Sequence, residues 1–352
     1  MFSWLMLIVG LVVILIGCDV FTNSIEWLGK KLDLNEGVLG SIFAAVGTAL
    51  PETLIPIVAV IFAGSAGEHA HDVGLGAIIG APFMLATVAM FVTGIAVFIF
   101  ARRGRRSTIM PVNTRILGRD IRFFLLAFAI ALASGFIEDR LAKVIIAIAL
   151  VFYYIFYVYK HATDKHDESP DEDVEDLSPL HFSRGTPDPS LTIVIVQIVA
   201  GLVMIIGAAY LFVQFVSEVA ASIGITPLIL SLIIVPLATE LPEKFNSVLW
   251  VRRSKDTLAL GNITGAMVFQ STLPVAFGMS FTEWRVSPEY APAFAQAAIA
   301  IIAAALLFLS LLQQKRLNAL ALVLSGVWYV VWIILVFPLD LAKLVEDWGW
   351  FR

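Results

Sequence analysis

Long apolar runs limit what this chain can fold into more than any other feature of its sequence. Each of ten runs is roughly long enough to cross a bilayer, which takes about 20 apolar helical residues. Hydrophobic residues make up 59% of the chain and charged residues 14%, against roughly 45–50% and 25% in soluble domains. We therefore expect an all-α polytopic membrane protein with about ten transmembrane helices. The runs cover residues 4–20, 37–63, 73–101, 121–135, 143–159, 191–216, 224–250, 257–279, 291–312 and 317–339.

The distribution of Lys and Arg predicts the orientation of these runs. If the N-terminus lies outside, 17 of the 23 Lys and Arg residues fall on inside segments and five on outside segments. Inside loops of membrane proteins carry an excess of these residues. We expect a protein of the plasma (inner) membrane with its N-terminus outside. Its expected partners are the lipid bilayer and inorganic cations, and no nucleic acid.

An internal repeat divides the chain. Residues 47–52 read Gly-Thr-Ala-Leu-Pro-Glu and residues 238–243 read Ala-Thr-Glu-Leu-Pro-Glu, and each hexapeptide is followed by a pair of glycines in the next run. Five runs in each half give the halves opposite orientations, as in the inverted repeats of secondary transporters. We expect a first five-helix repeat over 1–160, a solvated acidic inside loop over 161–190, and a second five-helix repeat over 191–352.

The two hexapeptides hold the intramembrane oxygen ligands that the sequence offers. Glu52 and Glu243 lie near the middle of their runs, where an ionised carboxylate cannot face lipid. Thr48 and Thr239 precede them by four residues, which places each Thr–Glu pair on one helical face. The proline before each glutamate frees a backbone carbonyl. Two such faces could supply the 6–8 oxygen ligands that Ca²⁺ prefers.

Two further charges stand beside the second glutamate. Glu240 and Lys244 are four residues apart in the order that favours an ion pair on a helix, and intramembrane Lys is rare and usually functional. One hypothesis makes Lys244 a fixed cation in place of a bound monovalent ion. The other hypothesis makes Lys244 a local ion-pair partner whose charge offsets the charge of Glu240. Away from the ends of the runs, only Glu52, Glu240, Glu243 and Lys244 are expected to be charged.

The glycine pairs predict where the next runs pack. Gly76 and Gly80 in the third run correspond to Gly261 and Gly265 in the eighth. Small residues let membrane helices approach closely. We expect the third and eighth runs to pack against the second and seventh beside the ion site.

The two hexapeptides resemble the α-repeats of the calcium/cation antiporter superfamily, and are most similar to those of prokaryotic sodium/calcium exchangers. The resemblance implies exchange of Ca²⁺ for Na⁺ by alternating access, with no cofactor beyond the transported ions. It implies that Glu52 and Glu243 bind Ca²⁺ and that Thr48 and Thr239 coordinate ions. It also implies that the first run of each half moves as a gate.

The chain departs from the family pattern around these residues. The family usually has Ser at positions 49 and 240, and further polar ligands in the third and eighth runs. Of those further ligands only Asn262 and Gln270 remain polar here. Both are candidate ion ligands, and H⁺ is an alternative to Na⁺ as the coupling ion. Exchange of Mg²⁺, Mn²⁺ or a monovalent ion and a non-transporting membrane sensor stay open. An intramembrane enzyme is disfavoured, because all five His residues fall outside the runs.

Overall fold

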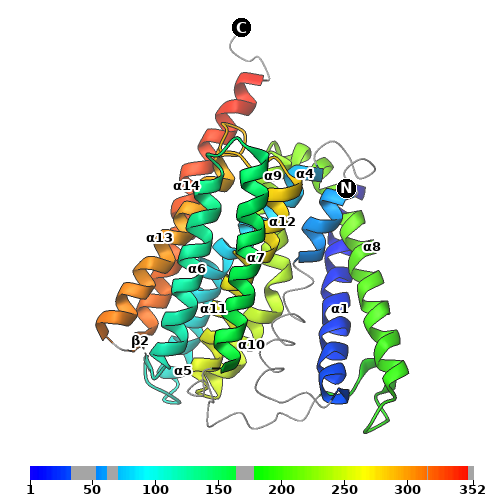
Figure 1. Cartoon of the computed structure of the whole chain (residues 1–352), viewed down its shortest axis with the longest axis vertical. Helices are drawn as coiled ribbons and strands as arrows, with labels where there is room; N and C mark the ends of the chain where they lie inside the picture. The colour runs from blue at the N-terminus through cyan, green and yellow to red at the C-terminus, as the bar shows by residue number, and fades with distance from the viewer. Residues whose placement is uncertain (33–52, 62–69, 164–177, 315, 348–352) are drawn as a thin grey trace.

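The computed structural model describes residues 1–32, 53–61, 70–163, 178–314 and 316–347, and for a few helical positions, 243 among them, only the backbone. These residues form a bundle of α-helices with two short strands (Figure 1). The elements are α1 (Phe2–Lys31), α4 (Ala70–Met84), the π-helix η1 (Leu85–Ala89), α5 (Met90–Arg102), β1 (Ile109–Met110), α6 (Thr114–Ser134), α7 (Arg140–Thr163), the 3₁₀-helix η2 (His181–Ser183), α8 (Leu191–Ile223), α9 (Pro227–Thr239), α10 (Leu241–Arg252), α11 (Asp256–Gln270), α12 (Leu273–Phe281), α13 (Ala291–Gln314), β2 (Leu317–Asn318) and α14 (Ala319–Asp347).

Six of the described helical segments are long and apolar enough to cross a membrane. Their outer faces carry large apolar side chains. On α14, for example, Leu324, Val327 and Ile334 are each more than half exposed. Such faces suit contact with lipid tails, since a helix that is apolar all round is typical of a membrane span. The expected all-α membrane class therefore agrees with the described residues. The six segments are Phe2–Lys31, Ala70–Arg102, Arg140–His161, Leu191–Ile223, Ala291–Gln314 and Ala319–Val336.

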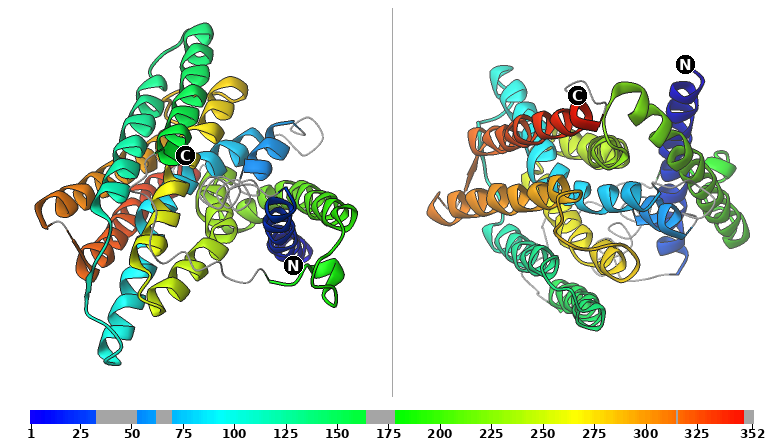
Figure 2. Two further views of the ribbon diagram at one scale, coloured as in Figure 1. Left: turned by 60° about the horizontal axis from the view of Figure 1, so that its bottom comes forward. Right: turned by 90° about the horizontal axis from the view of Figure 1, so that it is seen from above.

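Helices α1 and α8 form a closely packed pair at one side of the bundle (Figures 1 and 2). Glycines on both helices permit this approach. A Cβ on Gly17 would lie 3.2 Å from the backbone nitrogen of Ile205, and one on Gly201 would lie 3.0 Å from that of Phe21. Among the described residues, α1 and α8 make far more contacts with each other than with any other helix. In the described part of the chain, α1 therefore packs mainly against α8.

The expected close packing of the third run is present. A Cβ on Gly76 would lie 2.0 Å from the Ser231 Oγ and 2.9 Å from the Leu228 carbonyl oxygen, and one on Gly80 would lie 2.8 Å from the Leu232 carbonyl oxygen. Helix α4 thus packs against α9, the first part of the seventh run. At Gly261 no described atom lies within 4 Å of such a Cβ, so this close approach is seen only for the first glycine pair.

The third and eighth runs are interrupted helices. The third contains η1 between α4 and α5, and the eighth breaks between α11 and α12. Leu85 begins η1 and Gln270 ends α11. These two residues occupy corresponding positions in the repeat, 185 residues apart. The two interruptions therefore stand at corresponding positions of the third and eighth runs. A π-helical turn such as η1 frequently marks a functional site.

The expected boundaries of two runs are wrong. Helix α6 begins at Thr114, seven residues before the run at 121–135, and α1 continues to Lys31. Arg119 and Asp120 consequently lie inside α6 and are buried. The expectation of only four charges inside the runs is therefore also wrong. A hydropathy profile ends an expected membrane span at any local cluster of charges. It does so even where those charges pair with each other inside the bundle.

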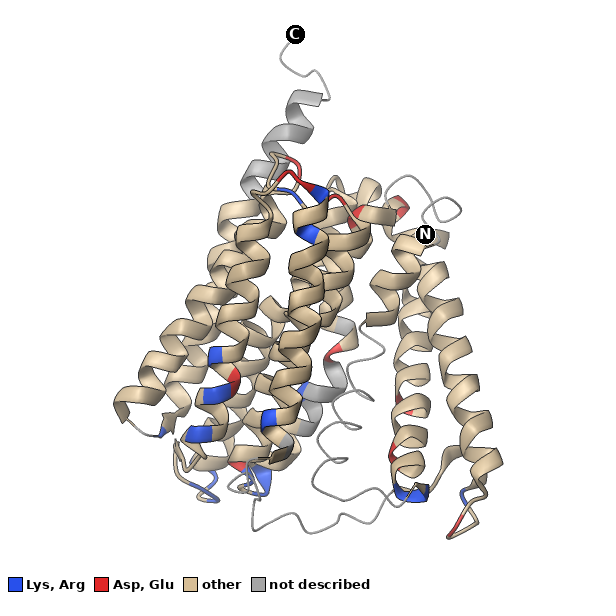
Figure 3. Ribbon diagram, in the orientation of Figure 1, with Lys and Arg blue, Asp and Glu red and all other residues tan. Residues whose placement is uncertain are grey.

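The linker between the halves is partly packed rather than wholly solvated. Its first residues, 161–163, extend α7. Residues 178–183, here called the strap, cross the ends of α1 and α8. Leu180 is buried in a small apolar cluster with Trp27 and Val194. The Trp27 Nε1 donates to the Ser178 carbonyl oxygen at 2.9 Å. Most described Lys and Arg residues lie at this end of the bundle (Figure 3).

Candidate functional site

The second hexapeptide lies at a helix break. Helix α9 ends at Thr239 and α10 begins at Leu241, with Glu240 between them and Pro242 as the second residue of α10. Proline fits the first turn of a helix because its missing N–H has no partner there. That Thr239 and Glu243 share one face stays a prediction, because the side chain of Glu243 lies outside the described residues. The two residues lie on opposite sides of the break.

Polar side chains at this break are buried. Thr239 is 3% exposed, Glu240 0% and Lys244 4%. The Lys244 Nζ lies 3.3 Å from the Glu240 Oε2, so the local ion pair expected from the spacing is present. The Thr239 Oγ1 donates to the Val235 carbonyl oxygen at 3.1 Å. That bond uses the hydroxyl hydrogen and leaves lone pairs on the oxygen for a cation.

Helix α11 folds back along α10 through the three-residue turn 253–255. The Ser247 Oγ donates to the Ala259 carbonyl oxygen at 3.1 Å and fixes the register of the two helices. The two helices run antiparallel. Three residues back along α10 and three residues forward along α11 from this bond, Lys244 lies level with Asn262. The Asn262 Nδ2 is buried and has no hydrogen-bond partner among the described residues. Helices α10 and α11 therefore each carry a polar residue at the level of Lys244.

The structure places the expected ion ligands as follows. Thr48 and Glu52 lie outside the described residues, as does the side chain of Glu243. Thr239, Glu240 and Lys244 come together at the break, and Asn262 lies on the neighbouring helix α11. Gln270 is buried at 1% exposure, but stands eight residues beyond Asn262, about 12 Å along a helix axis. The described residues hold no group of three or more His, Cys, Asp or Glu that could bind a metal.

Sequence reasoning missed a buried charged cluster on the other side of α11. The Asp120 carboxylate accepts hydrogen bonds from the Thr264 Oγ1 at 2.8 Å and the Tyr157 hydroxyl at 3.1 Å. The Arg119 Nε lies 3.4 Å from it. This cluster joins α6 and α7 to the helix that carries Asn262. The signal that could have indicated the cluster is the adjacent pair of opposite charges, Arg119 and Asp120, directly before the expected run at 121–135.

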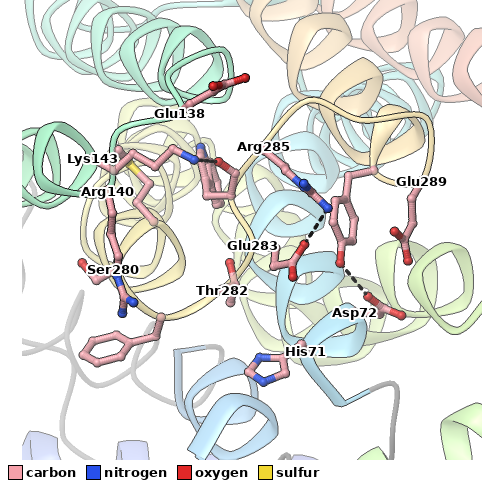
Figure 4. A pocket seen from close by; sticks show the side chains of 14 residues that line it. His71, Asp72, Glu138, Arg140, Lys143, Ser280, Thr282, Glu283, Arg285 and Glu289 are labelled. Atoms are coloured by element: carbon pink, nitrogen blue, oxygen red, sulfur yellow. Dashed lines mark hydrogen bonds and ion pairs between the residues drawn. The ribbon is translucent and has the colours of Figure 1, made fainter.

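A hollow of about 680 Å³ lies beside the starts of α4 and α7 (Figure 4). Figure 1 shows these helix starts at the end of the bundle opposite to the start of α8. Acidic side chains line it together with Arg140, Lys143 and Arg285. The Tyr290 hydroxyl donates to the Asp72 Oδ1 at 3.3 Å. Burial, reinforced by the charge of Asp72, raises the pKa of the Tyr290 phenol. The acidic residues that line the hollow are Asp72, Glu138, Glu283 and Glu289.

Three named proteins resemble this chain over 36% to 80% of its length. Antiporter CaxA of Alkalimonas amylolytica is 25% identical over 74% of this chain and 75% of its own. Inner membrane protein YrbG of Escherichia coli is 21% identical over 80% of this chain and 81% of its own. Sodium/calcium exchanger MaX1 of Methanosarcina acetivorans is 29% identical over 36% of this chain and 33% of its own.

Solved structures of exchangers share the fold. The H⁺/Ca²⁺ exchanger CAX superimposes with a TM-score of 0.66 at 17% identity, covering 98% of this chain and 90% of its own. The sodium-calcium exchanger NCX_Mj gives a TM-score of 0.57 at 20% identity, covering 95% of this chain and 98% of its own. The family described as sodium/calcium exchanger protein matches residues 2–160 and 193–337. These two structural neighbours are named as exchangers, which are transporters and not enzymes. The chain therefore belongs to the sodium/calcium exchanger protein family.

Proposed function

We propose that this protein is a secondary-active antiporter that exchanges Ca²⁺ for Na⁺ or H⁺ by alternating access. The observation that carries the proposal is the break between α9 and α10, where Thr239, Glu240 and Lys244 are buried inside a bundle whose core is mainly apolar. Buried charge is costly in a membrane and is typical of ion pathways. Membership of the exchanger family supports the same function.

The proposed architecture has ten transmembrane helices in two inverted five-helix halves, 1–160 and 191–352, joined by the linker 161–190. The pairing of α1 with α8 and the interrupted third and eighth runs support it. The start of α1 and the end of α14 lie at the same end of the bundle (Figure 1), which an even number of crossings requires. Proteins with this layout place the ion near the midplane between the halves.

Glu52 and Glu243 are the proposed Ca²⁺ ligands, with Thr48 and Thr239 beside them. Carboxylate, hydroxyl and carbonyl oxygens are the ligands that Ca²⁺ prefers. The hydroxyl of Thr239 supports this role, since its hydrogen already bonds within α9. Glu240, Lys244, Asn262 and Gln270 are the further proposed ion-binding residues on α10 and α11.

The pair of α1 and α8 is the proposed gate. Its few contacts with the other helices that the structure describes support movement as one body. The hollow lined by Asp72 and Glu283 is the proposed outer mouth (Figure 4), because acidic side chains raise the local concentration of cations. The basic end at Lys31 then faces inside, with the N-terminus outside in the plasma (inner) membrane.

Flux through the purified protein tests this function. Reconstituted vesicles are loaded with Na⁺ or held at acid internal pH, and uptake of radioactive Ca²⁺ is measured after dilution. We expect gradient-driven uptake that Glu52→Gln or Glu243→Gln abolishes. Asp139→Asn, an exposed carboxylate at a helix end, serves as the matched control. Uptake of Mg²⁺ or Mn²⁺ without Ca²⁺ would change the substrate, and no flux of any cation would refute transport.

A further inference from the structure

Basic residues gather at the end of the bundle where α5 and α10 end (Figure 3). Arg102 is the last residue of α5 and Arg252 the last residue of α10. Arg103 and Arg105 follow α5, and all four side chains are exposed. None of the four forms an ion pair with a described residue. These four residues are here called the arginine patch.

A buried clamp holds the two segments of the patch together. Arg106, next in sequence to Arg105, forms hydrogen bonds of 2.7 and 2.6 Å with the Asp256 carboxylate. Its Nη1 also donates at 2.8 Å to the carbonyl oxygen of Val251, the residue before Arg252. The Arg106 and Asp256 side chains are 5% and 1% exposed, so the clamp is shielded from water. Arginines far apart in the sequence are therefore held close to one another.

This arrangement favours the binding of anions. The clamp pairs Arg106 with Asp256, so neither residue neutralises the patch, whose four arginines carry a formal charge of +4. Like charges held close together repel one another, and more strongly beside an apolar bundle than in bulk water. Anions among the guanidinium groups remove this cost. A guanidinium can form two parallel hydrogen bonds with a phosphate, which makes phosphate a well-matched ligand.

The patch lies at the level of the lipid headgroups. Exposed apolar side chains recur every four residues along α5 and end at Ile99, and the last exposed large apolar residue of α10 is Leu249. Arg103 follows Ile99 by one helical turn, and Arg252 follows Leu249 by three residues, which is about 5–6 Å along a helix axis. The polar layer on each side of the hydrocarbon core is roughly 5–7 Å deep. The arginines therefore fall in the layer that contains the lipid phosphates.

We propose that the arginine patch is a binding surface for the headgroups of anionic phospholipids. Clusters of Lys and Arg beside the ends of membrane helices are typical of such surfaces. The occupant is a lipid rather than dissolved phosphate, because a lipid carries its phosphate at the level of the patch and its acyl chains along the apolar face of α5. The clamp shapes the surface, since it fixes the segment of Arg105 beside that of Arg252.

Native mass spectrometry of the full-length protein in detergent tests the proposal. The protein is titrated with anionic phosphatidylglycerol and with zwitterionic phosphatidylcholine of the same acyl chains. We expect tighter binding of phosphatidylglycerol, and no displacement of it by an equal concentration of inorganic phosphate. Arg103→Gln, Arg105→Gln and Arg252→Gln should each weaken binding of phosphatidylglycerol about fivefold and leave that of phosphatidylcholine unchanged.

Arg184→Gln is the matched control. Arg184 is also exposed, but it lies between the strap and the start of α8, so its loss should leave binding of phosphatidylglycerol unchanged. Unfolding midpoints are measured in parallel, and weaker lipid binding at an unchanged midpoint cannot arise from unfolding. Equal weakening by Arg184→Gln and by the patch variants would overturn the proposal. Equal binding of the two lipids by the wild type, or displacement by inorganic phosphate, would overturn it even if no patch variant folds. The measurement involves no flux, so its result is independent of the exchange proposed above.

Discussion

Two hydrogen bonds join the guanidinium of Arg106 to the carboxylate of Asp256, at 2.7 Å from Nη1 and 2.6 Å from Nη2. The Arg106 side chain is 5% exposed and that of Asp256 1%. The same Nη1 donates to the Val251 carbonyl oxygen at 2.8 Å. Arg106 follows α5, whereas Val251 and Asp256 flank the turn between α10 and α11. The pair therefore fixes the hairpin that carries Lys244 and Asn262.

Arg106→Ala should destabilise the protein by about 3–5 kcal/mol, because it leaves the buried Asp256 carboxylate without its partner. Arg106→Lys should recover only part of this loss, since an ammonium cannot reproduce the two parallel bonds. Thermal unfolding in detergent measures both. Arg103→Lys, at an exposed position of the same loop, should be near neutral. Equal midpoints for Arg106→Lys and Arg103→Lys would contradict the structural role.

Asp120→Ala should lower the stability of the fold more than the removal of any one hydrogen-bond or ion-pair partner of Asp120. It removes the acceptor of the Thr264 and Tyr157 bonds and leaves Arg119, 7% exposed, without its carboxylate. Thr264→Val removes one hydrogen bond and should cost about 0.5–1.5 kcal/mol. Thr93→Val is the matched control, because that buried hydroxyl bonds only within its own helix in the described contacts. Similar unfolding midpoints for Asp120→Ala and Thr93→Val would show that the cluster does not hold α11.

Gly76→Ala should push α4 away from α9. The added Cβ would meet backbone atoms of Leu228 and Leu232 at 2.9 and 3.1 Å, which side-chain rotation cannot relieve. Overpacking of this kind costs about 1–3 kcal/mol. Gly207→Ala, on the exposed face of α8 with no described atom within 4 Å, should be neutral or slightly stabilising. Unfolding midpoints that drop equally for both variants would contradict the packing argument.

Gln197→Leu should release the strap from α1 and α8. The Gln197 Nε2 donates to the Val20 carbonyl oxygen at 2.9 Å, and its Oε1 accepts from the Phe182 N–H at 2.9 Å. Removing the buried amide should cost about 1–3 kcal/mol. It should also speed hydrogen exchange at residues 180–183. The control is Gln214→Leu, which loses a hydrogen bond to the Tyr210 hydroxyl on the same helix and should leave hydrogen exchange at residues 180–183 unchanged. Unaltered exchange in Gln197→Leu would refute the role of the Gln197 amide.

Much of the candidate site could be predicted because its signals are local. The spacing of Glu240 and Lys244 predicts an ion pair, and the structure contains it. The small residues at 76 and 80 predict a close helix contact, which α4 makes with α9. Pro242 is the second residue of α10, where a proline without its N–H is tolerated.

The sequence by itself determined that the chain crosses a membrane and where its repeated Pro-Glu motifs lie, because hydropathy and short spacings are properties of neighbouring residues. Only the tertiary structure decided that Arg119 and Asp120 belong inside a helix, and that residues 178–183 pack against α1 and α8. Thr264, which hydrogen-bonds to Asp120, lies 144 positions away in the chain. A charge is stable inside the bundle when packing brings it such a partner, and no local pattern of residues contains that information.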